Sequence, residues 1–356
     1  METSTKKRRI REKPNISIDL PSDDTSIPSF DMTGEMTDVE LTSKILRSVS
    51  SENYLDKGSH GNVYNYIFDG NTHCVIKVGY VSDSAMSNEI AVLDELKKIR
   101  EPNTDCSNRI VDFCSNSYNY FQSGGSFYIV LQYRGESLHK SLYDYFEYPE
   151  KIKSLSNGLL KSIKCFHQMG FIHRDLKPQN ILKLDDIPIL IDFGSTASKS
   201  LETLDKIKEK GNVTLLYSSP LIENINNDNL FLVGIFYDVW SILLIITEMV
   251  IGVNLYNIYL EESIIPFYIL TLDSEDFFHF IKSLEIPKEY ELKWNQLLKC
   301  RDKLERGVMV NEDELYSVLV SPTKGGKKRR KTRRKTRRKT RRKRKKTKKT
   351  KKKKNK

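Results

Sequence analysis

The chain has 356 residues, of which 38% are hydrophobic and 30% charged, a composition typical of a globular protein with polar extensions and large enough for one large or two modest domains. The net charge of +12 is unevenly distributed, because residues 324–356 contain 25 Lys or Arg and no acidic residue, whereas residues 1–323 have a net charge of −13. The most apolar stretch, residues 239–253, is interrupted by polar side chains and is too short to span a bilayer, so we expect a buried helix there.

The N-terminal segment, residues 1–45, is rich in Ser, Thr, Asp and Pro and has no sustained hydrophobic periodicity. We therefore expect it to be disordered. The basic cluster at residues 6–9 is either a solvated charge run or a nuclear-import signal. The segment also lacks the apolar core of a signal peptide.

Strand patterns dominate the next part of the chain, residues 46–132. They lie at residues 63–68, 74–78, 109–113 and 127–132. The first two flank Asp69-Gly70-Asn71, a sequence that predicts the turn of a β-hairpin. Residues 87–99 have helical spacing of apolar side chains. We expect residues 46–132 to form a small, sheet-rich N-terminal lobe.

Helical patterns dominate residues 133–320. Leu155, Leu159, Ile163 and Phe166 lie on one helical face, and residues 239–249 are apolar nearly all round, as in a helix buried on every side. The predicted fold is therefore α+β in two lobes with a cleft between them. Residues 321–356 repeat Lys-Thr-Arg-Arg, and this low-complexity tail is predicted to be disordered.

The clearest chemical signal is the segment His173-Arg174-Asp175-Leu176-Lys177-Pro178-Gln179-Asn180, followed by Asp192-Phe193-Gly194. Two short strands predicted around Asp185-Asp186 would return Asp192 to the cleft that holds Asn180. Phosphoryl transfer from ATP requires metal ligands, a cation on the phosphates and a base. Asp175 is the candidate base. Asn180 and Asp192 offer the hard oxygen ligands that suit Mg²⁺.

These motifs resemble the eukaryotic protein kinase family across about residues 53–320. The resemblance implies a bilobal kinase fold, ATP and two Mg²⁺ ions as cofactors, and protein substrates. Lys177, two residues after Asp175, is typical of serine/threonine-specific members. Thr214 fits the same subgroup, in which its hydroxyl would bridge Asp175 and Lys177.

The resemblance also identifies the cation for the phosphates. Lys77 ends the predicted strand Cys74-Val75-Ile76-Lys77 and matches the family lysine that holds the α- and β-phosphates. Its expected ion-pair partner is Glu89, with Glu95 as the alternative. The separation of 12 residues between Lys77 and Glu89 is short for the family and similar to that of the vaccinia-related kinases.

The nucleotide pocket follows from the same resemblance. Its expected lining residues are Leu55, Gly58, Gly61, Val63, Val75, Lys77, Leu131, Gln132, Arg134 and Leu182. Gly58 and Gly61 permit close approach of the backbone to phosphate, although Asp56 replaces the first glycine of the family pattern. Backbone groups of Gln132 and Arg134 would contact the adenine edge. The compact Gly-x-x-Leu that follows resembles the casein kinase 1 and vaccinia-related group.

Two departures from the family pattern concern the activation segment and a late helix. Ser219-Pro220-Leu221 replaces Ala-Pro-Glu, so the glutamate that normally pairs with a late arginine is missing. Arg301 and Arg306 are both candidates for that arginine. Leu243 replaces a glycine in the helix whose Asp238 is expected to anchor the catalytic loop.

Regulation is expected at the residue before the base. In the family, an arginine at the position of Arg174 often receives a phosphate from the activation segment. The candidate regulatory residues are Arg174, Ser195, Thr196, Ser198, Ser200, Thr203 and Thr214. A phosphate on one of these hydroxyls would pair with the guanidinium.

The favoured function is therefore an active serine/threonine protein kinase. The alternatives are a pseudokinase scaffold tethered to nucleic acid and a small-molecule phosphotransferase. Residues 324–356 are expected to bind nucleic acid or another polyanion, unless this tail only solubilises the protein or folds back on the acidic body. Such a tail on a divergent kinase resembles proteins of large DNA viruses.

The cysteines bear on the compartment. Five are scattered along the chain without a CxxC pair, namely Cys74, Cys106, Cys114, Cys165 and Cys300. This odd, unpatterned set predicts a reducing compartment, no disulfide framework and no zinc site. We expect a soluble intracellular protein with no membrane partner, and the sequence does not distinguish nucleus, cytoplasm and virion.

Overall fold

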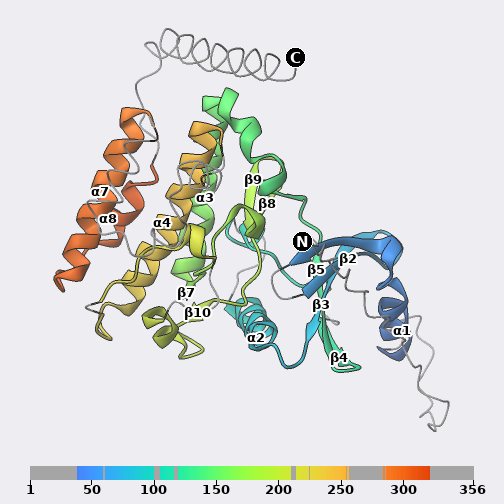
Figure 1. Cartoon of the computed structure of the whole chain (residues 1–356). Coiled ribbons are helices and arrows are strands. Elements are labelled where there is room, and N and C mark those ends of the chain that lie inside the picture. Colours follow the sequence, from blue (N-terminus) through green and yellow to red (C-terminus); the bar gives the residue numbers. More distant parts are fainter. Residues whose placement is uncertain are drawn as a thin grey trace, which may run out of the picture.

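An antiparallel sheet and a mainly helical region form the two halves of the computed structural model (Figure 1). The structure describes residues 38–58, 61–99, 105–115, 119–209, 214–223, 225–253, 255, 284 and 286–320. The sheet region precedes the helical region in the chain, so the predicted α+β bilobal fold is confirmed. The predicted disorder of residues 1–37 and 321–356 lies outside the described residues.

The N-terminal sheet has five antiparallel strands in the order β1-β2-β3-β5-β4. The strands are β1 (Tyr54–Gly58), β2 (Gly61–Phe68), β3 (Thr72–Tyr80), β4 (Tyr120–Ser123) and β5 (Ser126–Gln132). The predicted turn joins β2 to β3, where Asp69 and Gly70 have φ values of 50° and 81°. Aspartate and glycine tolerate this left-handed backbone. The Asp69 carboxylate also accepts a hydrogen bond from the Thr72 N–H at 3.1 Å.

Each face of this sheet packs against its own hydrophobic cluster. Successive side chains of a strand point to opposite faces, so neighbouring residues belong to different clusters. On β5, Ile129 and Leu131 belong to the main core with the helix α2 (Ser84–Ile99), whereas Val130 belongs to a smaller cluster on the other face. The smaller cluster includes Tyr66 of β2 and Ile76 of β3. The sheet therefore positions β3 between two apolar layers.

A helix that the sequence did not predict, α1 (Asp38–Ser48), covers the smaller cluster and lies beside the sheet in Figure 1. The prediction of disorder is therefore wrong for residues 38–45. Leu41 and Ile45 are four residues apart, so they share one helical face, and both are buried. A short polar helix is marginal alone, and it forms here because this face packs on the sheet.

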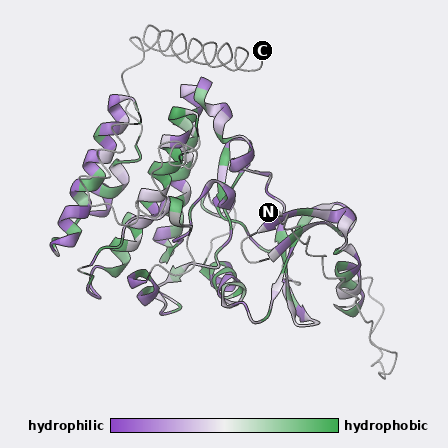
Figure 2. Cartoon of the chain, viewed as in Figure 1, coloured by the Kyte–Doolittle hydropathy of each residue, from purple (hydrophilic) through white to green (hydrophobic). Residues whose placement is uncertain are grey.

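The C-terminal region is built around one apolar helix, α4 (Leu230–Ile251). The other elements are β6 (Glu136–Ser137), α3 (Pro149–Gln168), β7 (Phe171–Ile172), β8 (Ile181–Leu184), β9 (Ile187–Leu190), β10 (Ala197–Ser198), α7 (Lys288–Glu305) and α8 (Glu312–Ser317). By length and composition α4 could cross a membrane, but 89% of its most apolar window is buried within the described fold. Figure 2 shows its hydrophobic residues among the neighbouring helices, as expected for a core helix.

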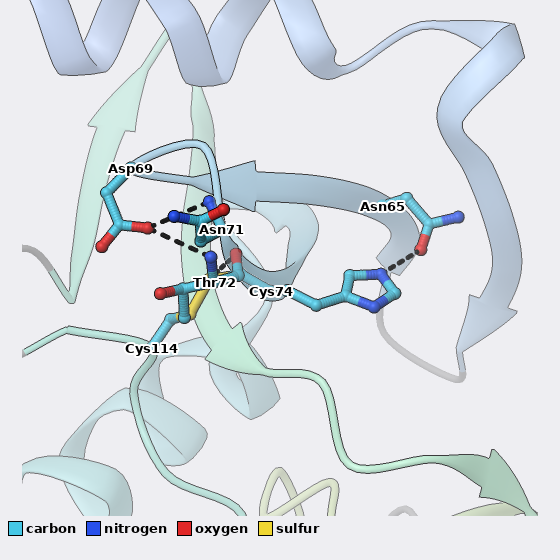
Figure 3. The surroundings of a disulfide bond; sticks show 7 residues. Asn65, Asp69, Asn71, Thr72, Cys74 and Cys114 are labelled. Atoms are coloured by element: carbon cyan, nitrogen blue, oxygen red, sulfur yellow. Dashed lines mark hydrogen bonds between the residues drawn. A yellow bond between two sulfur atoms is a disulfide. The ribbon is translucent and has the colours of Figure 1, made fainter.

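Two disulfides contradict the prediction that the cysteines are unpaired. Cys74 of β3 is bonded to Cys114 (Figure 3), and Cys106 is bonded to Cys165 of α3. The partners are separated by 40 and 59 residues, so no local spacing pattern could reveal them. Cys300 is a buried free thiol. The inference of a reducing compartment rested on unpaired cysteines and loses its basis.

The two disulfides act at different places in the fold. Cys74–Cys114 joins β3 to the segment that precedes β4, and the Cys114 N–H also donates to the Val130 carbonyl at 3.0 Å. Cys106–Cys165 joins the segment after α2 to α3, and so connects the sheet region to the helical region. Loops of these lengths correspond to about 4 kcal/mol of unfolded-state entropy each in the chain-entropy treatment.

Candidate active site

The predicted general base, Asp175, lies in a loop that is hydrogen-bonded to α4. The backbone N–H groups of His173 and Arg174 both donate to the Asp238 carboxylate at 2.8 Å. His167 of α3 contacts the same carboxylate at 2.8 Å. Asp238 is fully buried. The expected anchoring role of this aspartate is therefore visible as two direct hydrogen bonds to the loop.

The Asp175 carboxylate is surrounded by donors. One oxygen accepts from Lys177 Nζ at 2.8 Å and from Asn180 Nδ2 at 3.1 Å, and the other accepts from the Thr214 N–H at 2.7 Å. Lys177 Nζ also donates to Thr214 Oγ1 at 2.8 Å. Lys177 thus joins Asp175 to Thr214. The expected bridge had the Thr214 hydroxyl in the middle; instead that hydroxyl accepts from Lys177, and Asp175 accepts from the Thr214 backbone N–H. The side chains are held in place, with Asp175 only 6% exposed.

The hairpin of β8 and β9 returns the chain to Asn180, as the two predicted strands around Asp185-Asp186 require. The Ile191 N–H donates to the Asn180 carbonyl at 3.1 Å, so Asp192 follows directly beside Asn180. The turn uses left-handed backbone at Asp185 and Asp186, with φ of 48° and 62°. Aspartate is among the residues that tolerate such angles.

Asn180 and Asp192 fit the requirements of Mg²⁺. Asn180 Nδ2 donates to Asp175, which leaves the amide oxygen of Asn180 as the group available to a metal. In the part of the chain that the structure describes, no group of three or more His, Cys, Asp and Glu could by itself hold a metal. Mg²⁺ commonly binds through one or two protein oxygens plus phosphate and water, and this donor set matches that pattern.

Lys77 forms an ion-pair network with two carboxylates. Its Nζ lies 2.5 Å from Glu89 Oε2 and 3.0 Å from Asp192 Oδ1. Glu95, the alternative partner, instead contacts Lys98 at 3.1 Å near the surface. Burial disfavours the charged ammonium, but Asp192 and Glu89 outweigh it and raise the pKa of Lys77. Burial raises the pKa of Glu89, and Lys77 opposes that shift.

A pocket of about 930 Å³ brings these groups together. Of the predicted nucleotide contacts, those that line it are Leu55, Gly58, Val63, Val75, Lys77, Leu131, Gln132, Arg134 and Leu182. Lys177, Asn180, Asp192 and Thr214 line the same pocket. It therefore combines apolar side chains, suited to a nucleobase, with the charged and polar groups expected to bind phosphate and metal.

Gly61 is the predicted contact that does not line this pocket. A Cβ atom there would lie 2.3 Å from the Val78 carbonyl oxygen. Glycine is thus required by the packing of β2 against β3. Asp56, the acidic residue in the glycine loop, also lines this pocket; it is exposed, and its carboxylate accepts from the Lys57 N–H at 2.8 Å.

Sequence reasoning missed several lining residues. They are Lys57, Val111, Tyr133, Glu136, Ser137, His139, Lys140, Gln179, Ile191, Leu216 and Tyr217. Tyr133 stacks on His73 with ring centroids 4.1 Å apart, which supports the connection between the lobes. Gly135 has φ of 85°, and a Cβ there would lie 2.3 Å from the Lys183 carbonyl oxygen. The glycine at the end of the lobe connection is the sequence signal that could have predicted this close approach of the Gly135 and Lys183 backbones.

The candidate regulatory residues are arranged differently from the expectation. Arg174 donates to the carbonyl oxygens of Ser195 at 3.0 Å and Glu209 at 2.8 Å. Ser195 and Thr196 are buried, so in this conformation neither hydroxyl is accessible for phosphorylation. Thr203 Oγ1 accepts from the Ser198 N–H at 2.9 Å. The guanidinium therefore contacts backbone carbonyls of the segment that was expected to deliver a phosphate.

Other contacts anchor the activation segment where the glutamate of Ala-Pro-Glu is missing. Tyr217 Oη donates to Glu248 at 2.7 Å, and burial raises the pKa of Glu248. The Ile222 N–H donates to Tyr237 Oη at 3.0 Å. The Glu223 N–H donates to Glu305 at 3.2 Å. The anchoring carboxylates thus belong to α4 and α7.

Of the two candidate arginines, Arg301 lies at this anchor. It is 3.5 Å from Glu305, whereas Arg306 donates to the Asp302 carbonyl at the surface. Glu248 and Glu305 were missed because a glutamate in a helix has no sequence signal that identifies a partner far along the chain.

The sequence is similar to a known protein family and to several named proteins. The family model described as protein kinase domain matches residues 49–312. A "Probable serine/threonine-protein kinase" of Dictyostelium discoideum is 30% identical over 222 residues, which is 57% of this chain and 30% of that protein. Serine/threonine-protein kinase D of Synechocystis sp. is 40% identical over 84 residues, 22% of this chain and 15% of that protein.

A viral relative covers a similar part of the chain. A protein of Acanthamoeba polyphaga mimivirus, named as a serine/threonine-protein kinase, is 28% identical over 232 residues, 62% of this chain and 39% of that protein. The chain therefore spans less than half the length of each of these three relatives.

Proposed function

This chain belongs to the protein kinase family, and we propose that it transfers the γ-phosphate of ATP to serine or threonine hydroxyl groups of proteins. The observation that carries the proposal is the convergence of Lys77, Asn180 and Asp192 on one pocket of about 930 Å³. Asp175 is bonded directly to Asn180 and Lys177, which line this pocket. The Lys177 bridge between Asp175 and Thr214 supports serine/threonine specificity. The names of the matched relatives point to the same acceptor class.

The reaction assigns a separate role to each group. Asp175 accepts the proton of the substrate hydroxyl and orients its oxygen toward the γ-phosphate. Lys177 holds the Asp175 carboxylate in this position and places a positive charge beside the transferred group. Lys77 binds the α- and β-phosphates, and Glu89 keeps its ammonium in place. Backbone groups of Gln132 and Arg134 bind the adenine edge.

Asn180 and Asp192 would hold two Mg²⁺ ions. When bound, the metal supplies positive charge that neutralises the phosphate oxygens. The protein contributes the position of the two oxygen ligands, which the β8–β9 hairpin brings side by side. Asp192 also contacts Lys77 at 3.0 Å, so the metal ligand and the phosphate-binding cation are aligned with each other.

A transfer assay tests the proposal. The full chain is incubated with γ-labelled ATP, Mg²⁺ and acidic or basic protein substrates, beside Asp192→Asn. We expect labelled phosphoserine or phosphothreonine from the wild type and its loss in the variant, because an amide is a weaker Mg²⁺ ligand than a carboxylate. Asp186→Asn is the matched control, since Asp186 is exposed in the β8–β9 turn and asparagine tolerates its backbone angles.

Two results would contradict the proposal. If neither protein transfers phosphate, a pseudokinase scaffold becomes the better explanation. If only a small molecule is phosphorylated, the chain is a small-molecule phosphotransferase.

We also infer kinship with the casein kinase 1 and vaccinia-related group and an origin in a large DNA virus. The separation of 12 residues between Lys77 and Glu89 supports the first inference, since the two side chains form a direct ion pair across it. The Gly135-x-x-Leu138 segment and the replacement of the family glutamate by Leu221 are consistent with this group. The match to a mimivirus protein supports the second inference.

We propose further that residues 324–356 bind nucleic acid or a related polyanion. Their 25 basic residues without acidic neighbours support sequence-independent binding through counterion release. The logarithm of the association constant for duplex DNA should fall linearly with the logarithm of salt concentration, with a slope of about −0.9 per phosphate neutralised. A titration at several salt concentrations with the full chain and with residues 321–356 deleted measures this slope. Unchanged affinity and slope after the deletion would contradict the proposal.

A further inference from the structure

Asn88 is a polar residue of α2 that the reaction as described does not use. It directly precedes Glu89 and is half-buried. Its Nδ2 lies within hydrogen-bond distance of three carbonyl oxygens, those of Phe193 at 3.0 Å, Gly194 at 3.1 Å and Thr196 at 3.0 Å. Two N–H groups are thus shared among three acceptors on the segment that begins directly after Asp192.

The oxygen of the same amide has a charged partner. Lys206, in the short helical turn Leu204–Lys208, donates from Nζ to Asn88 Oδ1 at 2.5 Å. Asn88 therefore connects two parts of the activation segment that are ten or more residues apart. A hydrogen bond to a charged group is stronger than one between neutral groups, so Lys206 fixes the orientation of the amide and aims its N–H groups at the carbonyls.

The position of Asn88 links this contact to the metal ligand. The Phe193 carbonyl accepts from Asn88, and the Phe193 backbone lies close enough to Glu89 to lower the pKa of that carboxyl, an effect smaller than that of burial. Glu89 in turn pairs with Lys77, which contacts Asp192. Two consecutive residues of α2 thus hold the backbone next to Asp192, one through its carboxylate and the other through its amide.

Arg174 completes the arrangement. It donates to the carbonyls of Ser195 and Glu209, near the two ends of the segment that Asn88 and Lys206 contact. Arg174 lies close enough to Lys206 to lower the pKa of that lysine, an effect smaller than that of its burial. The two cations of this region, Arg174 and Lys206, therefore donate to neutral oxygens and join the segment to α2 and to the catalytic loop.

We propose that Asn88 is a positioning residue that, with Lys206 and Arg174, holds α2 and the activation segment in the phosphate-transfer arrangement without phosphorylation of that segment. The proposal rests on the proposed kinase function. It replaces the expectation that Arg174 receives a phosphate from one of the activation-segment hydroxyls.

The first test compares variants of the full chain. Asn88→Ala removes both contacts, and Asn88→Asp keeps an acceptor for Lys206 but removes the donor to the carbonyls. Both should lower kcat about 10- to 100-fold, as is typical when a group supporting a metal ligand is removed. Asn227→Ala is the matched control, since Asn227 accepts from Lys208 Nζ at 3.0 Å on the exposed surface, and it should retain wild-type activity.

A second variant covers the case in which the Asn88 changes impair folding. Lys206 is only partly buried, so Lys206→Met should fold. It should also lower kcat, and less than Asn88→Ala, since the amide loses its orienting partner but keeps its donors. The combined variant should be no worse than Asn88→Ala alone, because both changes act on one contact.

The decisive measurement is the activity of wild-type protein after treatment with a protein phosphatase that is then removed. Retained activity, with mass mapping that shows no phosphate between Asp192 and Pro220, supports the proposal. Loss of activity on dephosphorylation would overturn it, as would an Asn88→Ala or Asn88→Asp variant as active as the control.

A binding readout separates this proposal from the kinase function itself. Calorimetry measures the Kd of Mg²⁺–ATP for each variant without requiring transfer. If the wild type binds Mg²⁺–ATP but transfers no phosphate, the proposed function fails, and the role of Asn88 is still decided by whether its variants bind about 10-fold more weakly. In that case, equal affinity in wild type and both Asn88 variants would overturn the positioning role.

Discussion

Asp175→Asn is expected to lower kcat by about 100- to 10,000-fold, the usual contribution of a general base, with little change in ATP binding. The isosteric amide cannot accept the proton of the substrate hydroxyl. It also turns an NH₂ group toward Lys177 or Thr214, which both donate to the carboxylate in the wild type. Steady-state kinetics at varied ATP concentration give kcat and KM separately.

The control for this experiment is again Asp186→Asn, the same chemical change at an exposed position of the β8–β9 turn. A kcat for Asp175→Asn close to that of the control would remove Asp175 from the mechanism. A large rise in KM for ATP with unchanged kcat would assign Asp175 to nucleotide binding instead.

Lys77→Met is expected to abolish detectable transfer and to destabilise the fold by about 3–5 kcal/mol, the cost of leaving one side of a buried ion pair without its partner. Without the ammonium, the Glu89 and Asp192 carboxylates, which are 1% and 10% exposed, lose the cation that they share. Urea unfolding measures the stability, and the transfer assay measures the activity.

The double variant Lys77→Met/Glu89→Gln separates the two effects. Removing both charges should restore much of the lost stability, since replacing both partners of a buried pair is often close to neutral. Transfer should stay absent because the phosphates lack their cation. A double variant as unstable as Lys77→Met would show that the ion pair is not the source of the lost stability.

The pH dependence of Lys77→Met provides an independent check. Burial already raises the pKa of Glu89 in the wild type, and Lys77 opposes this shift. Removing Lys77 should raise the pKa further. A carboxyl whose folded-state pKa is raised contributes most stability when it is protonated, and that contribution is lost as pH rises through the folded pKa. The destabilisation should therefore be smaller at pH 5 than at pH 8.

The catalytic loop and its hairpin were readable from sequence because their geometry depends on near neighbours. Asp175, Lys177 and Asn180 lie within six residues, and the spacing alone brings Asn180 Nδ2 to Asp175. The strands around Asp185-Asp186 return the chain over a short distance, so Asp192 is placed by local pairing. The same holds for the turn at Asp69 and Gly70 and for the buried helix α4.

The contacts that anchor the activation segment could not be predicted from the sequence. Leu221 marks a missing carboxylate, but the sequence does not show that Glu248 and Glu305 accept hydrogen bonds from Tyr217 and Glu223. Those pairs are separated by 31 and 82 residues. Their contact depends on how α4 and α7 pack, which no local pattern specifies.

The sequence by itself determined the two-lobed α+β fold, the family and the candidate catalytic residues, since hydrophobic period, turn chemistry and short motif spacing all act between near neighbours in the chain. Only the tertiary structure decided the two disulfides, the helix α1 and the contacts of Asn88, which join residues 40 to 118 positions apart or depend on a packed face. The physical reason is that such contacts form only when distant segments pack together. Cysteine, asparagine, lysine and leucine occur throughout proteins, so their presence at one position does not identify a distant partner.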